Sequence, residues 1–258
     1  MVVFKIGGNV LNNPATLFEA LDYFAGLLEP AILVHGGGRR ADEVLRDMGH
    51  QPHMVDGRRI TDAETLEVVT MVYAGSINKH IVAQLQSRGT NAIGLSGTDG
   101  NAVLATKRPV KTIDYGYAGD VVAVNAPLLD ALLRLGLRPV LCPITHDNRG
   151  QLLNTNADTI ATEVATAMAA AGHRVRLDYC FEFPGVLRDV ADRDSVIGRL
   201  TPDSYDALRA AEVIGGGMIP KLDNAFRAIA AGVDRVVIGD LAALRTGKGT
   251  QVTAAAAD

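Results

Sequence analysis

The chain has 258 residues, of which 48% are hydrophobic, and a formal net charge of −4. A slightly acidic chain is not suited to a nucleic-acid partner bound through its phosphates, and we expect none. We find no charged and apolar leader and no uncharged run of the roughly 18 residues that span a bilayer, so we expect no membrane partner. Cys142 and Cys180 lie in separate apolar runs, which favours free thiols and a cytoplasmic location. The hydrophobic content predicts one large α/β unit or two closely joined lobes.

The first forty residues predict two strands that alternate with helices. An apolar strand over residues 1–6 is followed by an amphipathic helix over 14–28, a β-branched strand from Ile32 to His35 and a helix from Ala41. Glycines follow each strand. This alternation is typical of a parallel sheet covered by helices.

Three consecutive glycines, Gly36 to Gly38, are the first candidate binding element. Glycines before a helix let backbone N–H groups approach an anion, although a tight turn alone accounts for them about equally well. Gly36, Gly38 and Ala41 also fit a dinucleotide fingerprint, with Asp56 as the acidic ribose ligand. Lys5, inside the first apolar strand, either reaches the surface or meets an anion beside the next glycine pair.

The middle of the chain predicts one long helix and several strands. Residues 50–60 favour a hairpin containing Asp56 and Gly57, and Thr61 or Asp62 is suited to cap a helix over 62–88. The apolar stripe of that helix suits either the core or a subunit interface. Strands are expected over 91–95 and 138–144, an antiparallel pair within 103–124, and a helix over 127–135.

The second half begins with Asn154, Asn156 and Asp158 ahead of an Ala/Thr-rich helix to 171. Capping alone selects such residues, but alternate positions also point side chains into one cleft. A strand over 174–181, a helix over 201–212, a glycine loop over 213–221 ending in Lys221, a helix over 222–231 and a final strand over 235–238 follow. We therefore expect a division near residue 150 into two lobes of one sheet, 1–150 and 151–258.

Six motifs, FKIGGN, LVHGGG, DGRRIT, AGSINK, LLNTNAD and GGMIPK, stand in order along the chain. Together they resemble the amino acid kinase family, and within it the acylglutamate kinase branch. The resemblance displaces the dinucleotide interpretation, and no Walker motif G-x-x-x-x-G-K-[ST] occurs. It implies an open three-layer αβα sandwich with a mainly parallel central sheet, an N-terminal lobe that binds the acylated amino acid and a C-terminal lobe that binds ATP.

The resemblance also implies a set of site residues. Lys5 and Lys221 would be the catalytic cations, with Asp158 between them. The implied substrate-binding residues are Gly37, Gly38, Arg59, Asn154 and Asn156, and the implied nucleotide-binding residues are Gly8, Glu182, Gly185, Gly216 and Gly217. ATP would bring Mg²⁺ largely on its own phosphates, so no protein metal ligands are expected.

The reaction implied is phosphorylation of the side-chain carboxylate of N-acetyl-L-glutamate, the second step of arginine biosynthesis. N-succinyl-L-glutamate is the alternative, with Arg58 or Lys111 for its distal carboxylate. A second alternative is that the protein is not an enzyme but a non-catalytic amino-acid-binding regulator of the same fold. Phe181-Glu182 replaces the family's Thr/Ser-Asp pair, and Thr98 stands where many members have lysine. Without the N-terminal helix of arginine-inhibited hexamers, a homodimer insensitive to arginine is expected.

Overall fold

The computed structural model describes residues 1–55 and 58–254. The predicted Asp56-Gly57 turn, and Asp56 as a ribose ligand, lie outside the described residues. The strands are β1 (Val2–Ile6), β2 (Ala31–His35), β3 (Met54–Val55), β4 (Arg58–Arg59), β5 (Ala92–Leu95), β6 (Val103–Lys107), β7 (Ala118–Val124), β8 (Arg138–Leu141), β9 (Ile144–His146), β10 (Leu152–Thr155), β11 (Arg176–Cys180), β12 (Arg199–Leu200), β13 (Arg235–Gly239) and β14 (Thr250–Val252). The helices are α1 (Gly8–Asn12), α2 (Pro14–Ala25), α3 (Gly38–Asp47), α4 (Ala63–Thr70), η1 (Met71–Ile77), α5 (Asn78–Gln86), η2 (Asp99–Asn101), α6 (Ala126–Arg134), α7 (Ala157–Ala170), α8 (Pro202–Ala210), α9 (Met218–Ala230) and α10 (Leu241–Thr246).

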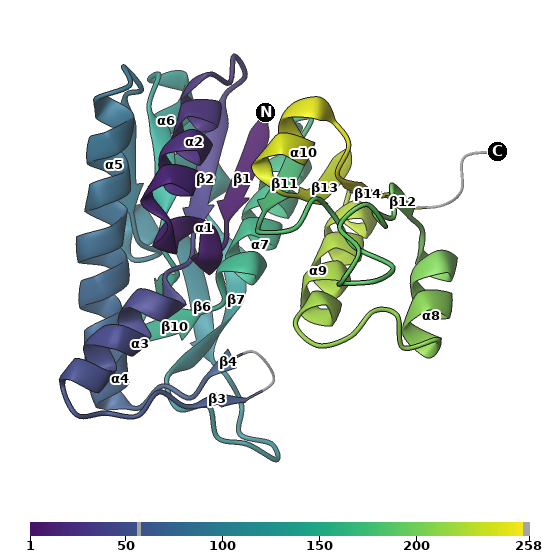
Figure 1. The fold of residues 1–258 in the computed structure, drawn as a ribbon. Helices are drawn as coiled ribbons and strands as arrows, with labels where there is room; N and C mark the ends of the chain where they lie inside the picture. The colour runs from purple at the N-terminus through teal and green to yellow at the C-terminus, as the bar shows by residue number, and fades with distance from the viewer. Residues whose placement is uncertain (56–57, 255–258) are drawn as a thin grey trace.

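An eight-stranded sheet in the order β12-β14-β13-β11-β1-β2-β8-β5 forms the centre of the molecule (Figure 1). Every neighbouring pair in it is parallel except β13 and β14. β1 lies in the middle, with β2, β8 and β5 on one side and the strands that follow α7 on the other. The predicted open αβα sandwich with a mainly parallel sheet is confirmed.

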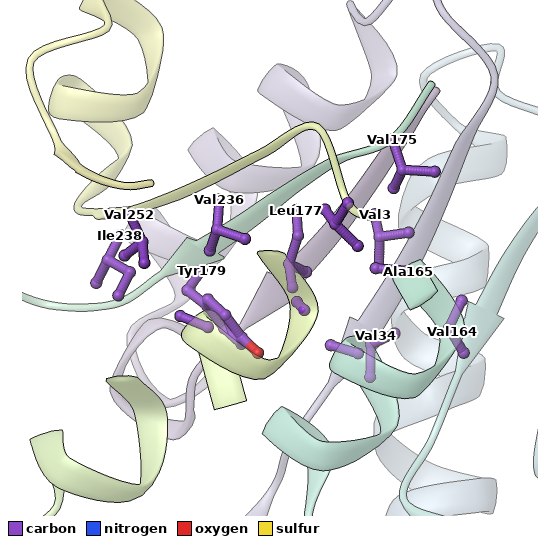
Figure 2. Packing of buried hydrophobic residues seen from close by; sticks show 14 of the residues in the cluster. Val3, Val34, Val164, Ala165, Val175, Leu177, Tyr179, Val236, Ile238 and Val252 are labelled. Carbon is purple, nitrogen blue, oxygen red and sulfur yellow. The ribbon is translucent and has the colours of Figure 1, made fainter. Parts of the chain in front are cut away.

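Alternating side chains of the central strands pack into two cores, one on each face of the sheet. Val2, Phe4 and Ile6 of β1 pack with α2 and α5 on one face, whereas Val3 packs with α7 and α9 on the other. Figure 2 shows the second core, where Val3, Val34 and Leu177 of the sheet lie against helical residues such as Val164 and Ala165. Burial on both faces explains why these strands are continuous apolar runs.

A smaller β unit lies beside the main sheet and contains β10, β7, β6 and β9 as a closed barrel. The expected antiparallel pair within 103–124 is present as β6 and β7. The single strand expected over 138–144 is wrong, because the chain leaves the main sheet after Leu141 and β9 joins the barrel. Pro143 lies at this break, where it has no N–H to give to a sheet. β10, which carries Asn154, was not expected.

The long helix predicted over 62–88 is present, but it is not uniformly α-helical. Asp62 caps it by accepting a hydrogen bond of 2.8 Å from the N–H of Thr65. Its middle, η1, is a π-helix between α4 and α5. The apolar stripe of the sequence runs through Tyr73, Ile77, Ile81 and Leu85 at steps of four residues, which exceed the 3.6 of an α-helix. A wider π turn brings these side chains back toward one face.

The C-terminal segment differs from expectation, since β13 is not the final strand. α10 and β14 follow it, and β14 pairs antiparallel with β13. Asp240 caps α10 by accepting a hydrogen bond from the N–H of Ala243, and Gly247 ends the helix in the left-handed conformation. Among the helices of residues 1–55 and 58–254, none has the length and apolar character to cross a membrane.

Candidate active site

Two lysines from distant parts of the chain meet on one carboxylate. Lys5 Nζ lies 2.6 Å from Asp158 Oδ1, and Lys221 Nζ donates a hydrogen bond of 3.0 Å to Asp158 Oδ2. Lys5 comes from the central strand β1 and Asp158 from the first turn of α7. Lys221 lies in the first turn of α9, not at the end of a glycine loop as expected, because α9 begins at Met218. The structure thus brings together the three predicted catalytic residues.

The charges of this triad depend on one another. Burial alone raises the pKa of Asp158, but the ammonium groups of Lys5 and Lys221 outweigh it and hold the pKa of the carboxyl well below its usual range. Burial lowers the pKa of Lys5, and the attraction of Asp158 opposes that effect. With both carboxylate oxygens engaged, the triad carries one net positive charge when both lysines are protonated.

Lys221 also lies against two aromatic rings. Its Nζ is 5.3 Å from the centroid of Tyr179 and 5.8 Å from that of Phe181, within the range of cation–π attraction. The hydroxyl of the buried Tyr179 is 2.6 Å from Thr162 Oγ1 of α7. Phe181, which the resemblance marked as a departure, therefore lies beside the ammonium group of Lys221.

A cavity of about 330 Å³ opens beside Lys5 and Asp158. It is lined by Lys5, Gly8, Gly36, Gly37, Gly38, Arg39, Met54, Arg58, Arg59, Tyr73, Arg108, Ala118, Gly119, Pro143, Asn154, Thr155, Asn156, Ala157, Asp158 and Thr159. Five of these residues are cationic and only one is anionic, so the cavity is suited to an anionic ligand. Gly8 and all five predicted substrate-binding residues are in its wall.

Arg59 is held at one side of this cavity by a network the sequence did not reveal. Its Nη1 donates to Asp42 of α3 and its Nη2 donates to the carbonyl oxygen of Gly38 at 3.2 Å. Burial favours the neutral guanidinium, yet the bond to Asp42 and the nearby Tyr73 raise the pKa of Arg59. The guanidinium is thereby fixed in place and stays charged.

The two asparagines have different environments. Asn154 of β10 donates a hydrogen bond of 3.0 Å to the hydroxyl of the buried Thr61. The side-chain oxygen of Asn156 accepts hydrogen bonds from the N–H groups of Asp158 and Thr159, at 2.8 and 3.2 Å. Asn156 therefore caps α7, as capping alone would predict, and it also lines the cavity.

The glycine loop before α3 has a packing reason as well as a place in the cavity wall. A Cβ at Gly37 would lie 2.5 Å from Ile77 Cδ1 and 2.9 Å from Tyr73 Cδ1, both in η1. Only glycine therefore fits between the cavity and the π-helical turn. Gly38 begins α3, whose N-terminal N–H groups have no helical partners.

A second hollow of about 550 Å³ adjoins the cavity and shares Arg58 and Arg108 with it. Lys111, Tyr115 and Asp120 are in its wall. Arg108 donates to Asp120, whereas the buried Nε of Arg58 has no hydrogen-bond partner among the described residues. The hollow thus extends the cavity with cationic side chains, including the two that the sequence suggested.

A third hollow, of about 100 Å³, is lined only by apolar and glycine residues. They are Phe183, Gly185, Val186, Leu187, Val190, Val213, Ile214, Gly215 and Met218. Of the predicted nucleotide-binding residues it includes Gly185 but not Glu182, Gly216 or Gly217. Glu182 accepts a hydrogen bond of 2.7 Å from Asn9, and Gly217 is the N-cap of α9. Gly216 has φ +55°, a conformation that favours glycine.

Tyr73 and Arg108 line the cavity and Asp42 pairs with Arg59, and the sequence indicated none of the three for the site. Tyr73 was assigned to the apolar stripe, and only its hydroxyl distinguished it from its neighbours. Asp42 was part of a helix and Arg108 part of a strand excursion, with no local signal for either. Within the described ranges, we find no cluster of three or more His, Cys, Asp or Glu that could hold a metal ion.

Comparisons with known proteins cover nearly the whole chain. The family model for the amino acid kinase family matches residues 1–240. An acetylglutamate kinase of Cytophaga hutchinsonii is 55% identical over 239 residues, 92% of this chain and 90% of that protein. An acetylglutamate kinase of Phocaeicola vulgatus is 52% identical over 252 residues, 98% of each chain. The crystal structure of smu.665 from Streptococcus mutans UA159 is 26% identical, with a TM-score of 0.80 and 98% of both chains covered.

Proposed function

The chain belongs to the amino acid kinase family, and from this we propose that it transfers the γ-phosphoryl group of ATP to the side-chain carboxylate of N-acetyl-L-glutamate. The product would be an acyl phosphate, the second intermediate of arginine biosynthesis. Relatives that are 50% identical or more, and that match this chain over 90% or more of their own length, bear the name acetylglutamate kinase. The family expected from the six motifs is confirmed.

The observation that carries the proposal is the Lys5–Asp158–Lys221 triad at the edge of a cationic cavity. Phosphoryl transfer requires positioning of the reactants and neutralisation of charge on the equatorial oxygens. The two ammonium groups would approach the transferring group from opposite sides, and Asp158 would hold both in place. Gly8, in the same cavity wall, would offer its backbone N–H to that group.

The acceptor would lie between the triad and Arg59. Arg59 would pair with the α-carboxylate through its planar fork, while Gly37 and Gly38 would present backbone N–H groups to the reacting carboxylate. Asn154, with Asn156 beside it, would bind the acylamino group. The α-amine must be acylated because a free amine would attack its own glutamyl phosphate and cyclise.

ATP is supported as the donor by the family, and the apolar hollow beside Gly185 is suited to its adenine. Gly216 and Gly217 would then lie near the phosphates at the N-terminus of α9, and Glu182 near the nucleotide. Both oxygens of Asp158 are engaged by lysines, so Mg²⁺ would be held mainly by the ATP phosphates. When bound, Mg²⁺ would neutralise charge that develops on the β- and γ-phosphoryl oxygens.

N-Succinyl-L-glutamate is the second candidate substrate, and Arg58 favours it. The side chain of Arg58 lines both the main cavity and the hollow that contains Lys111. A distal carboxylate on the acyl group would find a cation there. The planar guanidinium of an arginine is suited to pair with a carboxylate.

Trapping the acyl phosphate as its hydroxamate, with both substrates side by side, tests the function. We expect turnover with ATP and a kcat/KM that favours N-acetyl-L-glutamate. A preference for the succinyl compound of tenfold or more, about 1.4 kcal/mol, would overturn the choice of acyl group. Binding of the amino acid without turnover would instead support a regulator.

A homodimer in the cytoplasm, formed from subunits with an acceptor lobe over 1–150 and a nucleotide lobe over 151–258, completes the proposal. The apolar stripe of the long helix does not support the dimer, because Leu66, Val69, Ile81 and Leu85 are buried within the chain itself. A different surface must therefore form the contact. Light scattering measures the mass directly, and a hexamer or inhibition by sub-millimolar arginine would contradict this part.

A further inference from the structure

A buried polar chain connects the long helix to the glycine loop of the cavity. His35 is the last residue of β2 and Asn78 the first of α5, and their exposed fractions are 0% and 1%. Asn78 Nδ2 lies 2.9 Å from the carbonyl oxygen of Val140 and 3.1 Å from His35 Nε2. On the other side of the ring, His35 Nδ1 lies 2.7 Å from the carbonyl oxygen of Gly36.

The partners determine which ring nitrogen carries the proton. The carbonyl of Val140 only accepts, so it requires the amide nitrogen of Asn78. Lys79 Nζ donates to Asn78 Oδ1 at 3.2 Å and selects the same orientation. His35 Nε2 is therefore the acceptor, and Nδ1–H donates to Gly36. Burial lowers the pKa of His35 to about 4, so the ring is neutral near pH 7.

This bond determines the direction of the next N–H group. In a trans peptide the carbonyl and the N–H point in opposite directions. Because the Gly36 carbonyl is turned toward the buried His35, the N–H of Gly37 points away from it. On the helix side, Tyr73 and Ile77 of η1 occupy the space that a Cβ at Gly37 would need. The loop is thereby held between the imidazole and the π-helical turn.

We propose that His35 and Asn78 are positioning residues that aim the Gly36–Gly37 peptide at the acceptor carboxylate. The proposal rests on the proposed function. Neither side chain lines the cavity, so they act through the backbone of the loop. The π-helical turn has a related role, since it places Asn78 at the imidazole and Tyr73 beside both Gly37 and Arg59.

Three substitutions at one position separate this role from a general contribution to stability. In His35→Asn, the amide nitrogen falls near the place of Nδ1 and keeps a donor for Gly36. In His35→Gln, the amide lies near Nε2 and serves Asn78 but not Gly36. His35→Leu removes both bonds, and Asn78→Leu removes the donor that selects the tautomer while preserving the volume.

We expect His35→Gln and His35→Leu to raise the KM for N-acetyl-L-glutamate by about tenfold or more, the scale of one misdirected hydrogen bond to an anion. The KM of His35→Asn for the amino acid should stay within about threefold of wild type, and that of Asn78→Leu should lie between the values of His35→Asn and His35→Gln. The KM for ATP should change by less than about twofold in all four variants. Each variant is assayed below its own melting temperature, so lost stability does not mimic lost binding.

The proposal would be overturned if all four variants had the same KM for the amino acid. It would also be overturned if the KM for ATP rose as much as the KM for the amino acid. An equal rise in His35→Asn and His35→Gln would also overturn it, because the Gly36 donor would then be irrelevant. The wild-type protein is measured on N-acetyl-L-glutamate in the same assay. A failed function would appear as an inactive wild type, and a failed positioning role as active variants with unchanged KM.

Discussion

The cavity beside Lys5 and the hollow beside Gly185 are built in different ways. The cavity, about 330 Å³, has charged and amide side chains and glycine backbone in its wall, and hydrogen bonds to neighbouring groups hold Arg59 and Asn154 in place. The hollow, about 100 Å³, is lined only by apolar and glycine residues and is shaped by packing. Chemistry on an anion requires directed donors, and such donors need a satisfied network behind them. A flat base requires mainly a surface of matching shape.

The largest expected effect is at the triad, which lies at the edge of the cavity. Lys5→Ala and Lys221→Ala should each lower kcat on the order of 100-fold or more, because each removes one fixed cation from the transition state. Steady-state kinetics with N-acetyl-L-glutamate and ATP provide the measurement. Lys248→Ala is the matched control, since Lys248 is exposed and lines neither the cavity nor the two hollows. Wild-type turnover in either triad variant would contradict the assignment.

A second prediction uses the acid sensitivity of the network behind the cavity. The folded pKa of His35, about 4, is below the unfolded value of 6.5. The stability contribution of a neutral His35 is therefore complete above pH 6.5 and is lost as the pH falls toward 4. At about 1.4 kcal/mol per pH unit, the loss is about 3 kcal/mol.

Urea unfolding of wild type and His35→Asn at pH 7 and near pH 4 measures this loss. Wild type should lose about 3 kcal/mol more than the variant over that interval, since all other titrating groups are shared. If both proteins lost the same free energy of unfolding, protonation of His35 would cost little. The cavity would then not depend on this buried network, and the contrast with the apolar hollow would be weaker.

Substitutions of Arg59 test the proposed binding of the amino acid at the side of the cavity away from the triad. Arg59→Ala should raise the KM for the amino acid by roughly 10- to 100-fold and leave the KM for ATP nearly unchanged, because it removes ground-state binding of a carboxylate. Arg59→Lys, which keeps the charge without the planar fork, should recover only part of the loss. Arg149→Ala is an exposed arginine control. Equal rises in both KM values would mean that Arg59 does not separate the two substrates.

The sequence indicates the three residues of the triad but not all of what holds the residues of the cavity. Lys5 is indicated by a charge beside glycines in an apolar strand, whereas Lys221 and Asp158 are implied by the resemblance that six motifs carry. Asp42, in contrast, reaches Arg59 across 17 positions of the chain, and no local pattern marks it. Such pairings depend on how α3 packs against β4, which only the folded chain shows.

The missed elements have local causes. The steps of four residues between Tyr73, Ile77 and Ile81 indicate a turn wider than an α-helix, although the stripe was attributed to a regular helix. Pro143 indicates the break between β8 and β9. Asp240 and Gly247 are a cap pair seven residues apart that indicates α10, a short helix beyond the strand that the sequence predicts to be the last.

The smallest expected effect is at the apolar hollow. Gly215 is exposed and has open space where a Cβ would be, so Gly215→Val should fold normally and fill part of the hollow. We expect the KM for ATP to rise by about tenfold, or about 1.4 kcal/mol, with the KM for the amino acid unchanged. Gly198→Val is the matched control, since Gly198 is also exposed and unobstructed but lies outside the hollow.

Because packing alone shapes this hollow, a further change such as Val213→Ala should restore part of the ATP affinity. No single second substitution should do the same at the cavity, because a change of side-chain volume does not rebuild a donor that a hydrogen-bond network holds in place. An unchanged KM for ATP in Gly215→Val would place the adenine elsewhere and remove the basis for comparing the two regions as acceptor and nucleotide sites.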